Sequence, residues 1–243
     1  MTRSPEVLLR KLTRREFRQR MDSGELQGCI IPIGAIEQHL EHLAMEHDWR
    51  SVSVVAEGIA RRMAPRVLVA EGLMVGVSEH HMNHRGTLTL RPGTFLNVLE
   101  DLIESVVRAG FTNVLVLNGH GGNIQPVQAV WQQFVRRFPV NLQFLSYFAT
   151  LDETDAADLL QGGKTCPKHL PGHAQEFETS IALAAFPENV RPDAMADQPD
   201  QAPALATADQ GQQFLERIED RVSKHLEAML SGESVEPIPP MYP

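Results

Sequence analysis

Residues 114–123 read VLVLNGHGGN, and the order of this stretch decides the fold that we expect. The compact apolar run at its start predicts a buried strand, and the three glycines allow the backbone to turn sharply. Apolar residues at Val127, Val130, Phe134 and Phe138 then follow the spacing of a helix. The stretch therefore predicts a strand, a tight glycine turn that holds His120, and a helix.

The same alternation continues along the chain in both directions. Apolar runs predict further strands at residues 28–34, 66–70, 87–90 and 140–148. Helical spacing predicts helices at residues 14–22, 49–63, from 94 towards 110, at 176–186 and over 214–229. Alternating strands and helices indicate an α/β fold whose mostly parallel sheet is flanked by helices on both faces.

The domain organisation follows from length and composition. A chain of 243 residues can form one core, so we expect a single domain over residues 1–243. Four prolines among residues 187–206 predict an irregular connector, followed by a C-terminal helix and tail over residues 207–243. The Pro-rich end, residues 237–243, is not expected to be helical.

Charge and hydrophobicity exclude several classes of partner. Lys plus Arg number 22 against 31 Asp plus Glu, and the formal charge of −9 gives no basic surface for nucleic acid or anionic lipid. No stretch approaches the roughly 20 apolar residues that cross a bilayer, so we do not expect a membrane partner. We expect a cytoplasmic location. Cys29 and Cys166 form no CxxC pair and are expected to be reduced, structural thiols.

Histidines gather in the loops that are expected to follow the strands. Nine of the ten lie between His39 and His173. In an open α/β sheet, the loops at the carboxyl ends of the strands form the ligand crevice. We therefore expect distant polar groups to converge there.

The first polar cluster comes directly after the strand at residues 28–34. Seven of the twelve residues from Glu37 to Asp48 are acidic or histidine. Glu37 and His39 stand two apart, so in an extended segment both side chains point to the same side. Oxygen and imidazole ligands without a thiolate suit Zn²⁺, Mn²⁺ or Fe²⁺. The alternative is a solvated loop that is merely rich in charge.

Three further clusters can contribute to the same crevice. The glycine loop offers His120, and it lacks the Lys-Ser/Thr of a phosphate-binding loop. His173 stands ahead of a predicted helix, where either Glu176 or Glu178 can simply satisfy the helix dipole. The segment at residues 78–87 holds three histidines, and we expect Ser78, His81 and His84 to contact substrate, along with the backbone at Gly121 and Gly122.

Taken together, these motifs resemble the creatininase family of amidohydrolases. In this sequence they read Pro32-Ile-Gly34-Ala-Ile-Glu37-Gln-His39, His42-Leu43 with Asp48, Ser78 with His81, the NGHGGN of residues 118–123, and His173-Ala174 with Glu178-Thr179-Ser180. The matches keep their order and span residues 32–180, which is most of the chain.

The resemblance implies a doubly wound α/β fold and two divalent metal ions per chain, Zn²⁺ or alternatively Mn²⁺ or Fe²⁺. Asp48 would bridge the ions, Glu37 and His120 would serve one, and His39 the other. Creatininase itself has a glutamate ligand where this chain has Gly122. The resemblance therefore points to Glu178, rather than Glu176, as the residue that completes the second site.

The resemblance also implies the reaction. A metal-activated water would attack a polarised carbonyl carbon, with His173 as the proton donor to the leaving group and Glu178 supporting the metal. The expected substrate is a small, cyclic, polar molecule, and the expected bond is the C–N bond of a cyclic amide, lactam or formamide.

Two other functions stay open. One is hydrolytic opening of a C–C bond in a cyclic diketone such as an oxidised inositol, and the other is a metal-binding or small-molecule-binding protein without turnover. Departures from the family pattern at Leu40, Glu41, His84 and Arg85 change the expected pocket wall. Family members also imply a homo-oligomer, with a hexamer as one option.

Overall fold

The fold is built on four parallel strands. The computed structural model describes residues 5–161 and 170–236. Strands β1 (Gly28–Ile33), β2 (Val67–Val69), β3 (Asn113–Asn118) and β4 (Asn141–Ser146) form one sheet in the order β2-β1-β3-β4. All three pairings are parallel, as the alternation of strands and helices predicted.

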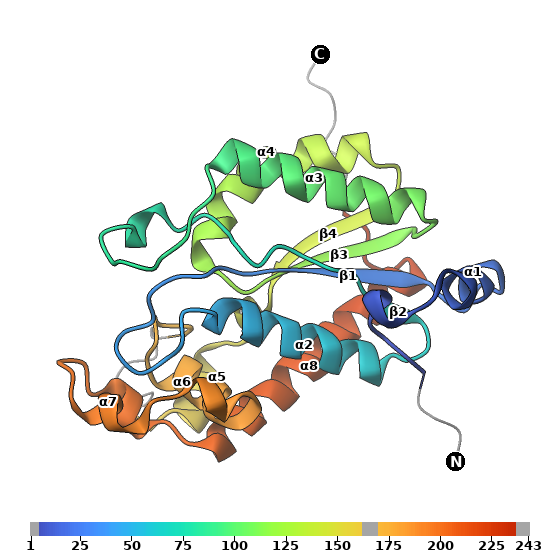
Figure 1. Ribbon diagram of the computed structural model, residues 1–243. Helices are drawn as coiled ribbons and strands as arrows, with labels where there is room; N and C mark the ends of the chain where they lie inside the picture. The colour runs from blue at the N-terminus through green and yellow to red at the C-terminus, as the bar shows by residue number, and fades with distance from the viewer. Residues whose placement is uncertain (1–4, 162–169, 237–243) are drawn as a thin grey trace.

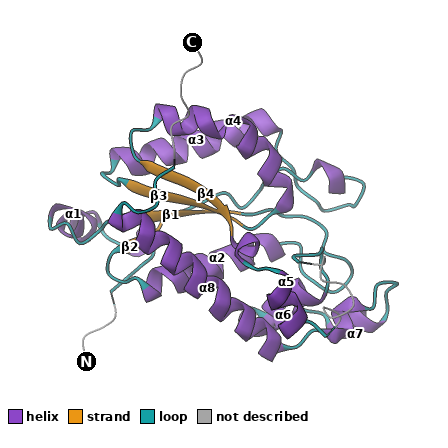
Figure 2. Ribbon diagram, turned by 180° about the vertical axis from the view of Figure 1, so that it is seen from behind, coloured by secondary structure: helices purple, strands orange, loops and turns teal. Residues whose placement is uncertain are grey.

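Helices cover both faces of this sheet, as predicted (Figure 1). Helices α3 (Pro92–Arg108) and α4 (Ile124–Arg137) lie on one face, and α2 (His47–Arg62) and α8 (Ala208–Ser231) lie on the other. Helix α1 (Arg14–Asp22) lies beside the amino ends of the strands. The short helices α5 (Glu153–Leu159), α6 (Glu176–Ala185) and α7 (Pro192–Ala196) extend the layer formed by α2 and α8 (Figure 2).

The continuous apolar runs of β1 and β3 are explained by burial on both sides. In β1, Ile30 packs towards α2 and α8, whereas Cys29 and Ile31 pack towards α3 and α4. In β3, Leu115 packs towards α2 and α8, and Val116 packs towards α3 and α4. Successive strand residues point to opposite faces, so a strand with a helix layer on each face requires apolar residues at every position.

Local sequence signals fix several helix ends. Thr13 and Glu16 form the capping box that starts α1, as their spacing predicted. Thr207 and Gln210 form another at the start of α8, which ends at Gly232 in the left-handed conformation. Helix α3 begins at Pro92, two residues before the predicted Thr94, because proline fits the first turn of a helix.

Three expectations were wrong in detail. Residues 87–90 do not form a strand, because their backbone bonds to loops rather than to a strand: Leu88 N–H donates to the carbonyl of Ile36, and Leu90 N–H donates to the carbonyl of Gly76. Helix α5, capped by Asp152, was not predicted. The connector at residues 187–206 contains α7 and two short 3-10 turns, Pro187–Asn189 and Ala202–Leu205.

Helices able to span a membrane are absent from the described part of the chain. Cys29 is buried in the sheet, and burial raises the pKa of its thiol to about 12. The Pro-rich end and Cys166 lie outside the described residues.

Candidate metal centre

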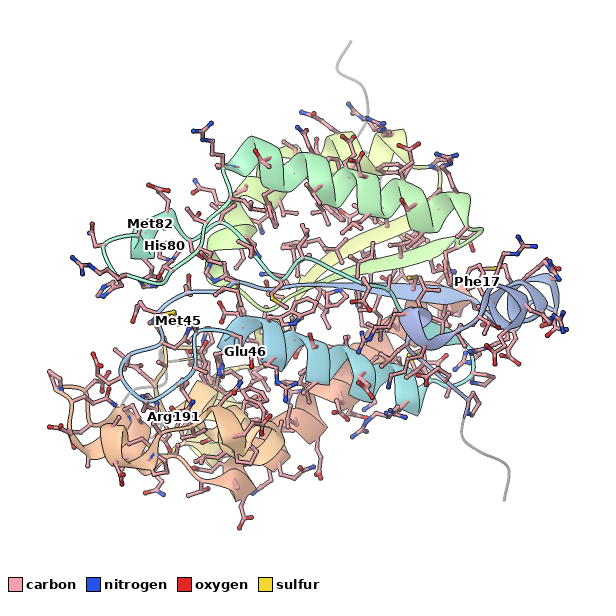
Figure 3. The ribbon with its side chains drawn as sticks, viewed as in Figure 1. Phe17, Met45, Glu46, His80, Met82 and Arg191 are labelled. Atoms are coloured by element: carbon pink, nitrogen blue, oxygen red, sulfur yellow. The ribbon has the colours of Figure 1, made fainter. Side chains whose placement is uncertain are left out.

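Five predicted ligands converge beyond the carboxyl ends of β1 and β3. Glu37 and His39 lie in the loop after β1, Asp48 in the first turn of α2, and His120 two residues after β3. Glu178 comes from the first turn of α6, far away in the sequence. All five are almost fully buried, with exposed fractions of 1–6%. Figure 3 shows the segments around Met45, Glu46 and His80 grouped at this end of the molecule.

Asp48 lies between the two imidazoles. Its Oδ1 is 3.1 Å from Nε2 of His39, and its Oδ2 is 2.8 Å from Nδ1 of His120. Each oxygen of the one carboxylate thus faces a different histidine. This is the arrangement that a carboxylate bridging two cations requires.

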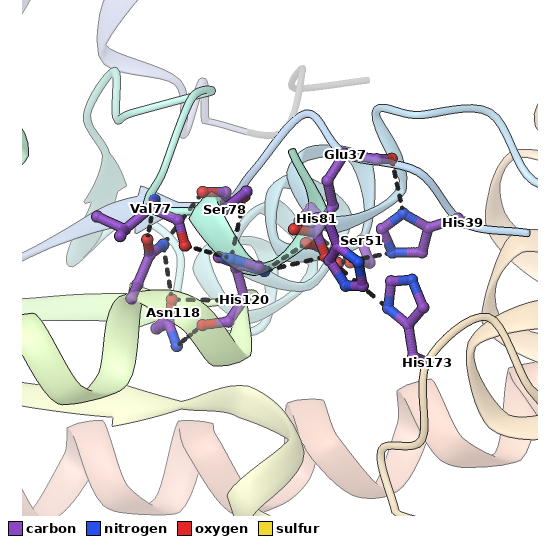
Figure 4. Close-up of polar contacts among 12 residues, drawn as sticks. Glu37, His39, Ser51, Val77, Ser78, His81, Asn118, His120 and His173 are labelled. Carbon is purple, nitrogen blue, oxygen red and sulfur yellow. Dashed lines mark hydrogen bonds and ion pairs between the residues drawn. The ribbon is translucent and has the colours of Figure 1, made fainter. Parts of the chain in front are cut away.

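The remaining nitrogen of each of these histidines is held by a backbone carbonyl (Figure 4). Nδ1 of His39 donates to the carbonyl of Glu37 at 3.0 Å, and Nε2 of His120 lies 3.0 Å from the carbonyl of Val77. Ser78 Oγ is a further neighbour of His120 Nε2, at 3.2 Å. A second hydrogen bond of this kind orients a metal-ligating imidazole and fixes which nitrogen faces the ion.

Two asparagines of the glycine loop fix its position. The Asn118 side chain accepts from the backbone N–H of His120 at 3.1 Å and donates to the carbonyl of His120 at 2.8 Å. Asn123 accepts from the backbone N–H of Val77 at 2.9 Å and donates to the carbonyl of Gly34 at 3.1 Å. These bonds tie together the loops that carry Glu37, Ser78 and His120.

The carboxylates flank the two histidines. Oε1 of Glu37 is 3.5 Å from Nδ1 of His120, and Oε2 of Glu178 is 3.8 Å from Nε2 of His39. Glu176, in contrast, accepts from the backbone N–H of Gln161 at 2.6 Å and from Gln210 Nε2 at 2.9 Å. Of the two glutamates, Glu178, which the family resemblance favoured, is the one that lies in the cluster.

The charges of the cluster fit bound cations. Burial raises the pKa of Glu37, and it raises the pKa of Glu178 to about 8. Burial acts in the same direction on Asp48, but the neighbouring His39 and His120 outweigh it and hold the pKa of Asp48 far below its ordinary value. Burial lowers the pKa of His39, but attraction to Asp48 dominates and raises it to about 10.

Two oxygen atoms in this cluster lack hydrogen bonds. Within the described residues, Glu37 Oε2 and Asp48 Oδ2 are buried and accept no hydrogen bond, although Oδ2 has its ion-pair contact with His120. A buried carboxylate oxygen without a donor is costly unless a cation balances it. The set of three carboxylates and two imidazoles therefore fits divalent transition metals.

A pocket of about 330 Å³ opens beside these ligands. It is lined by Glu37, Asp48, His80, His81, Gly119, His120, Gly121, Gly122, Phe148, Pro171, Gly172, His173 and Glu178. Of the predicted substrate contacts, His81, Gly121 and Gly122 reach this pocket. Ser78 lies buried behind His120, and His84 is exposed outside the pocket lining.

Gly122 has no space for a side chain. A Cβ there would lie 2.1 Å from the carbonyl oxygen of Val77 and 2.9 Å from Cε1 of His80. The segment that carries His80 therefore fills the place that a side chain at residue 122 would take.

His173 lies at the pocket wall, beside Glu37 and His39. Its Nε2 is 2.8 Å from both the carbonyl and the side-chain amide of Gln38, and its Nδ1 is 3.8 Å from Oε1 of Glu37. Its ring stacks on that of His81 at 4.4 Å. Burial, with the positive charge of His39 and the nearby His81, lowers the pKa of His173 to about 4.

Four further residues near the cluster were not among the predicted site residues: Gln38, His47, His80 and Phe148. His80 lines the pocket, with its ring 5.7 Å from that of His120 and nearly parallel to it. The adjacent pair His80-His81 was a visible signal, but spacing did not show that both side chains line the pocket. Phe148 follows β4 and had no polar signal that pointed to a site.

Known proteins resemble this chain in sequence and in fold. The family model described as "Creatininase: Creatinine amidohydrolase" matches residues 10–220. A 3-dehydro-scyllo-inosose hydrolase from Thermotoga maritima is 30% identical over 193 residues, which cover 77% of this chain and 59% of that protein. The match to this relative thus spans less than two thirds of its length.

A creatinine amidohydrolase from Pseudomonas putida is 27% identical over 215 residues, which cover 81% of this chain and 78% of that protein. A solved creatininase structure named as a manganese form superimposes with a TM-score of 0.76 at 24% identity, covering 92% of this chain and 99% of that one. At this identity, the superposition shows a shared fold. The family match covers most of the chain, and the chain therefore belongs to the creatininase family of metal-dependent hydrolases.

Proposed function

We propose that this chain uses two divalent metal ions to hydrolyse a C–N bond in a small cyclic amide, lactam or formamide. The observation that carries the proposal is the position of Asp48, whose two oxygens face His39 and His120 at 3.1 and 2.8 Å. Glu37 and His120 would hold one ion with Asp48, and His39 and Glu178 would hold the other. Such ions supply Lewis acidity, which brings the pKa of water towards neutrality and polarises a carbonyl oxygen.

The proposed ligand set limits which metal ions the centre can hold. Imidazole and carboxylate ligands accept Zn²⁺ and Mn²⁺. Among the solved creatininase structures similar to this chain, one is named as a manganese form and another as a Zn–Zn form. We propose Zn²⁺ first, with Mn²⁺ or Fe²⁺ as alternatives.

His173 is proposed to move the proton. Its pKa of about 4 leaves the imidazole unprotonated at neutral pH, so it must take up a proton before it can act as an acid. Gln38 occupies Nε2, which leaves Nδ1 to accept the proton of the attacking water and return it to the leaving nitrogen. His81 stacks on His173 and helps to orient its ring.

A second function has its own support. The Thermotoga relative is named for a cyclic oxidised inositol, and it is 30% identical over 77% of this chain. Attack of water on a ring ketone, followed by C–C cleavage, needs the same polarised carbonyl and the same proton transfer. Three histidines that are not proposed metal ligands, His80, His81 and His173, line the pocket and offer hydrogen-bonding groups for hydroxyls.

A substrate panel tests these functions. The chain is stripped with a chelator, reloaded with Zn²⁺ or Mn²⁺, and assayed on cyclic amides, lactams, formamides and oxidised cyclitols. Turnover of an amide supports the first function. Turnover of cyclitols alone contradicts it in favour of the second, and bound metal without turnover of any compound indicates a binding protein.

The metal centre is tested with a matched pair of variants. Asp48→Ala should remove most bound metal and lower activity at least about 100-fold, because it deletes the ligand shared by both ions. Asp101→Ala, an exposed aspartate of α3, should keep the metal content of the wild type. Wild-type protein that binds no transition metal would contradict the proposal.

A further inference from the structure

His47 is a buried histidine whose ring has no hydrogen bond to any described side chain or backbone group. It is the first residue of α2 and only 1% exposed. Neither Nδ1 nor Nε2 has a hydrogen-bond partner within the described residues. Buried polar groups are nearly always paired, because leaving one unpaired costs free energy.

The ring of His47 stands next to the second half of the metal centre. One of its nitrogens, a nitrogen of His39 and a carboxylate oxygen of Glu178 all lie within 4.8 Å of one another. Its ring centroid is 5.0 Å from that of His39 and 5.6 Å from that of Phe186. Two atoms bound to one ion at about 2.0–2.2 Å lie at most about 4.4 Å apart, so a separation within 4.8 Å places the three groups close to the spacing that a shared ion requires.

A nearby histidine shows what a purely structural role looks like. His42, in the same segment and 0% exposed, has both nitrogens partnered. Its Nε2 lies 2.8 Å from Thr179 Oγ1, and its Nδ1 lies 3.2 Å from Gln198 Nε2. His47 is equally buried but lacks such partners, so packing alone does not account for an imidazole at this position.

We infer that His47 is a further protein ligand of the ion held by His39, Asp48 and Glu178. The inference rests on the proposed two-metal centre. It makes the two sites unequal: one has two imidazoles and two carboxylates, and the other has His120 with Glu37 and the shared Asp48. The site with His47 should prefer Zn²⁺ or Co²⁺ over Mn²⁺, since imidazole ligands favour the former.

Metal titration of variants tests this role. His47→Phe keeps an aromatic ring between His39 and Phe186 but removes both nitrogens. With Co²⁺ as the probe, it should weaken binding of one ion at least about tenfold and change the visible absorption of that ion, while the other ion is unaffected. His225→Gln, in α8 and away from the centre, is the matched control.

The outcomes separate the inference from the proposed function. Unchanged affinity and absorption in His47→Phe would overturn the inference, and so would equal weakening of both ions, which indicates an effect through the fold. Wild-type protein that binds no Co²⁺ would instead overturn the two-metal proposal.

A measurement on the wild type avoids any folding defect of the variant. X-ray absorption of the Zn²⁺-loaded protein should count three imidazoles for two ions. A count of two imidazoles would contradict ligation by His47.

Discussion

Two glutamates at the start of α6 show how finely the site depends on single residues. Glu176 and Glu178 stand two apart, so the helix sends their carboxylates in different directions. Glu176 binds the backbone N–H of Gln161 and the Gln210 side chain, whereas Glu178 faces His39. Glu176 thus stabilises the fold through hydrogen bonds, and Glu178 faces the candidate metal centre.

The different partners of Glu176 and Glu178 predict that one variant loses metal binding and the other loses stability. Glu178→Gln should weaken binding of one of the two ions at least about tenfold, because it removes a charged ligand. Glu176→Gln should retain both ions and lower the free energy of unfolding by about 1–3 kcal/mol, since it weakens hydrogen bonds to a charged acceptor. Metal content and urea unfolding of both variants check this, and metal loss in Glu176→Gln alone would contradict it.

The neighbouring glycines 121 and 122 give a second prediction. Gly122→Ala would place a Cβ 2.1 Å from the Val77 carbonyl oxygen, so the backbone must move. We expect it to lose about 1–3 kcal/mol of stability and to weaken metal binding through His120. Gly121→Ala meets nothing within 4 Å and should change stability by less than about 0.5 kcal/mol. Equal thermal stability of the two variants would contradict this account.

At the scale of elements, α8 positions the helix that carries Glu178. Gly211 of α8 lies against the backbone of α6, and a Cβ there would be 1.8 Å from the carbonyl oxygen of Ser180. The close approach of these helices depends on the missing side chain. The position of Glu178 is therefore set in part by a glycine of another helix.

Replacing Gly211 by alanine should destabilise the protein, although alanine usually stabilises a helix interior relative to glycine. Alanine favours a helix interior over glycine by about 0.5–1 kcal/mol, but Gly211→Ala should still lose about 1–3 kcal/mol, because it forces α8 away from α6. It should also weaken binding of the ion that Glu178 is proposed to hold. Thermal unfolding and Co²⁺ titration measure both effects.

Gly58→Ala in α2 is the control for that prediction. Its Cβ would meet the Oε1 atom of Glu219 at 2.1 Å, but this is the end of a flexible side chain. The side chain can turn away and give up only an exposed ion pair with Arg62, worth at most about 1 kcal/mol. Gly58→Ala should therefore be close to neutral, and a loss as large as that of Gly211→Ala would contradict the packing argument.

At the scale of the whole molecule, each face of the sheet has one of the two tryptophans. Trp49 packs against the core between the sheet and helices α2 and α8. Trp131 belongs to the core between the sheet and helices α3 and α4. The expected single domain requires both cores to unfold together. A homo-oligomer also stays a prediction for this chain.

Each tryptophan can report on its own face. In Trp131→Phe, fluorescence follows Trp49, and in Trp49→Phe it follows Trp131. For one cooperative domain, fluorescence and far-UV circular dichroism should give the same urea midpoint within each variant. A second step in circular dichroism, absent from the fluorescence of that variant, would show that the two faces unfold separately.

The sequence by itself determined the class of fold and the residue types of the candidate site. Strand, turn and helix signals are local, so the run at residues 114–123 predicted β3, its glycine turn and α4 within a few residues. The ligand types at Glu37, His39, Asp48 and His120 were equally visible, and the order of motifs identified the family. These features depend on neighbours in the chain.

Only the tertiary structure decided which side chains meet. It brought Glu178 rather than Glu176 to His39, set Ser78 behind His120, and turned His80 and His47 towards the cluster. It also left residues 87–90 outside the sheet, since their backbone bonds to the loop residues Ile36 and Gly76. The physical reason is the same in each case: the direction of a side chain and the partner of a strand depend on segments far apart in the sequence, and no local pattern encodes those contacts.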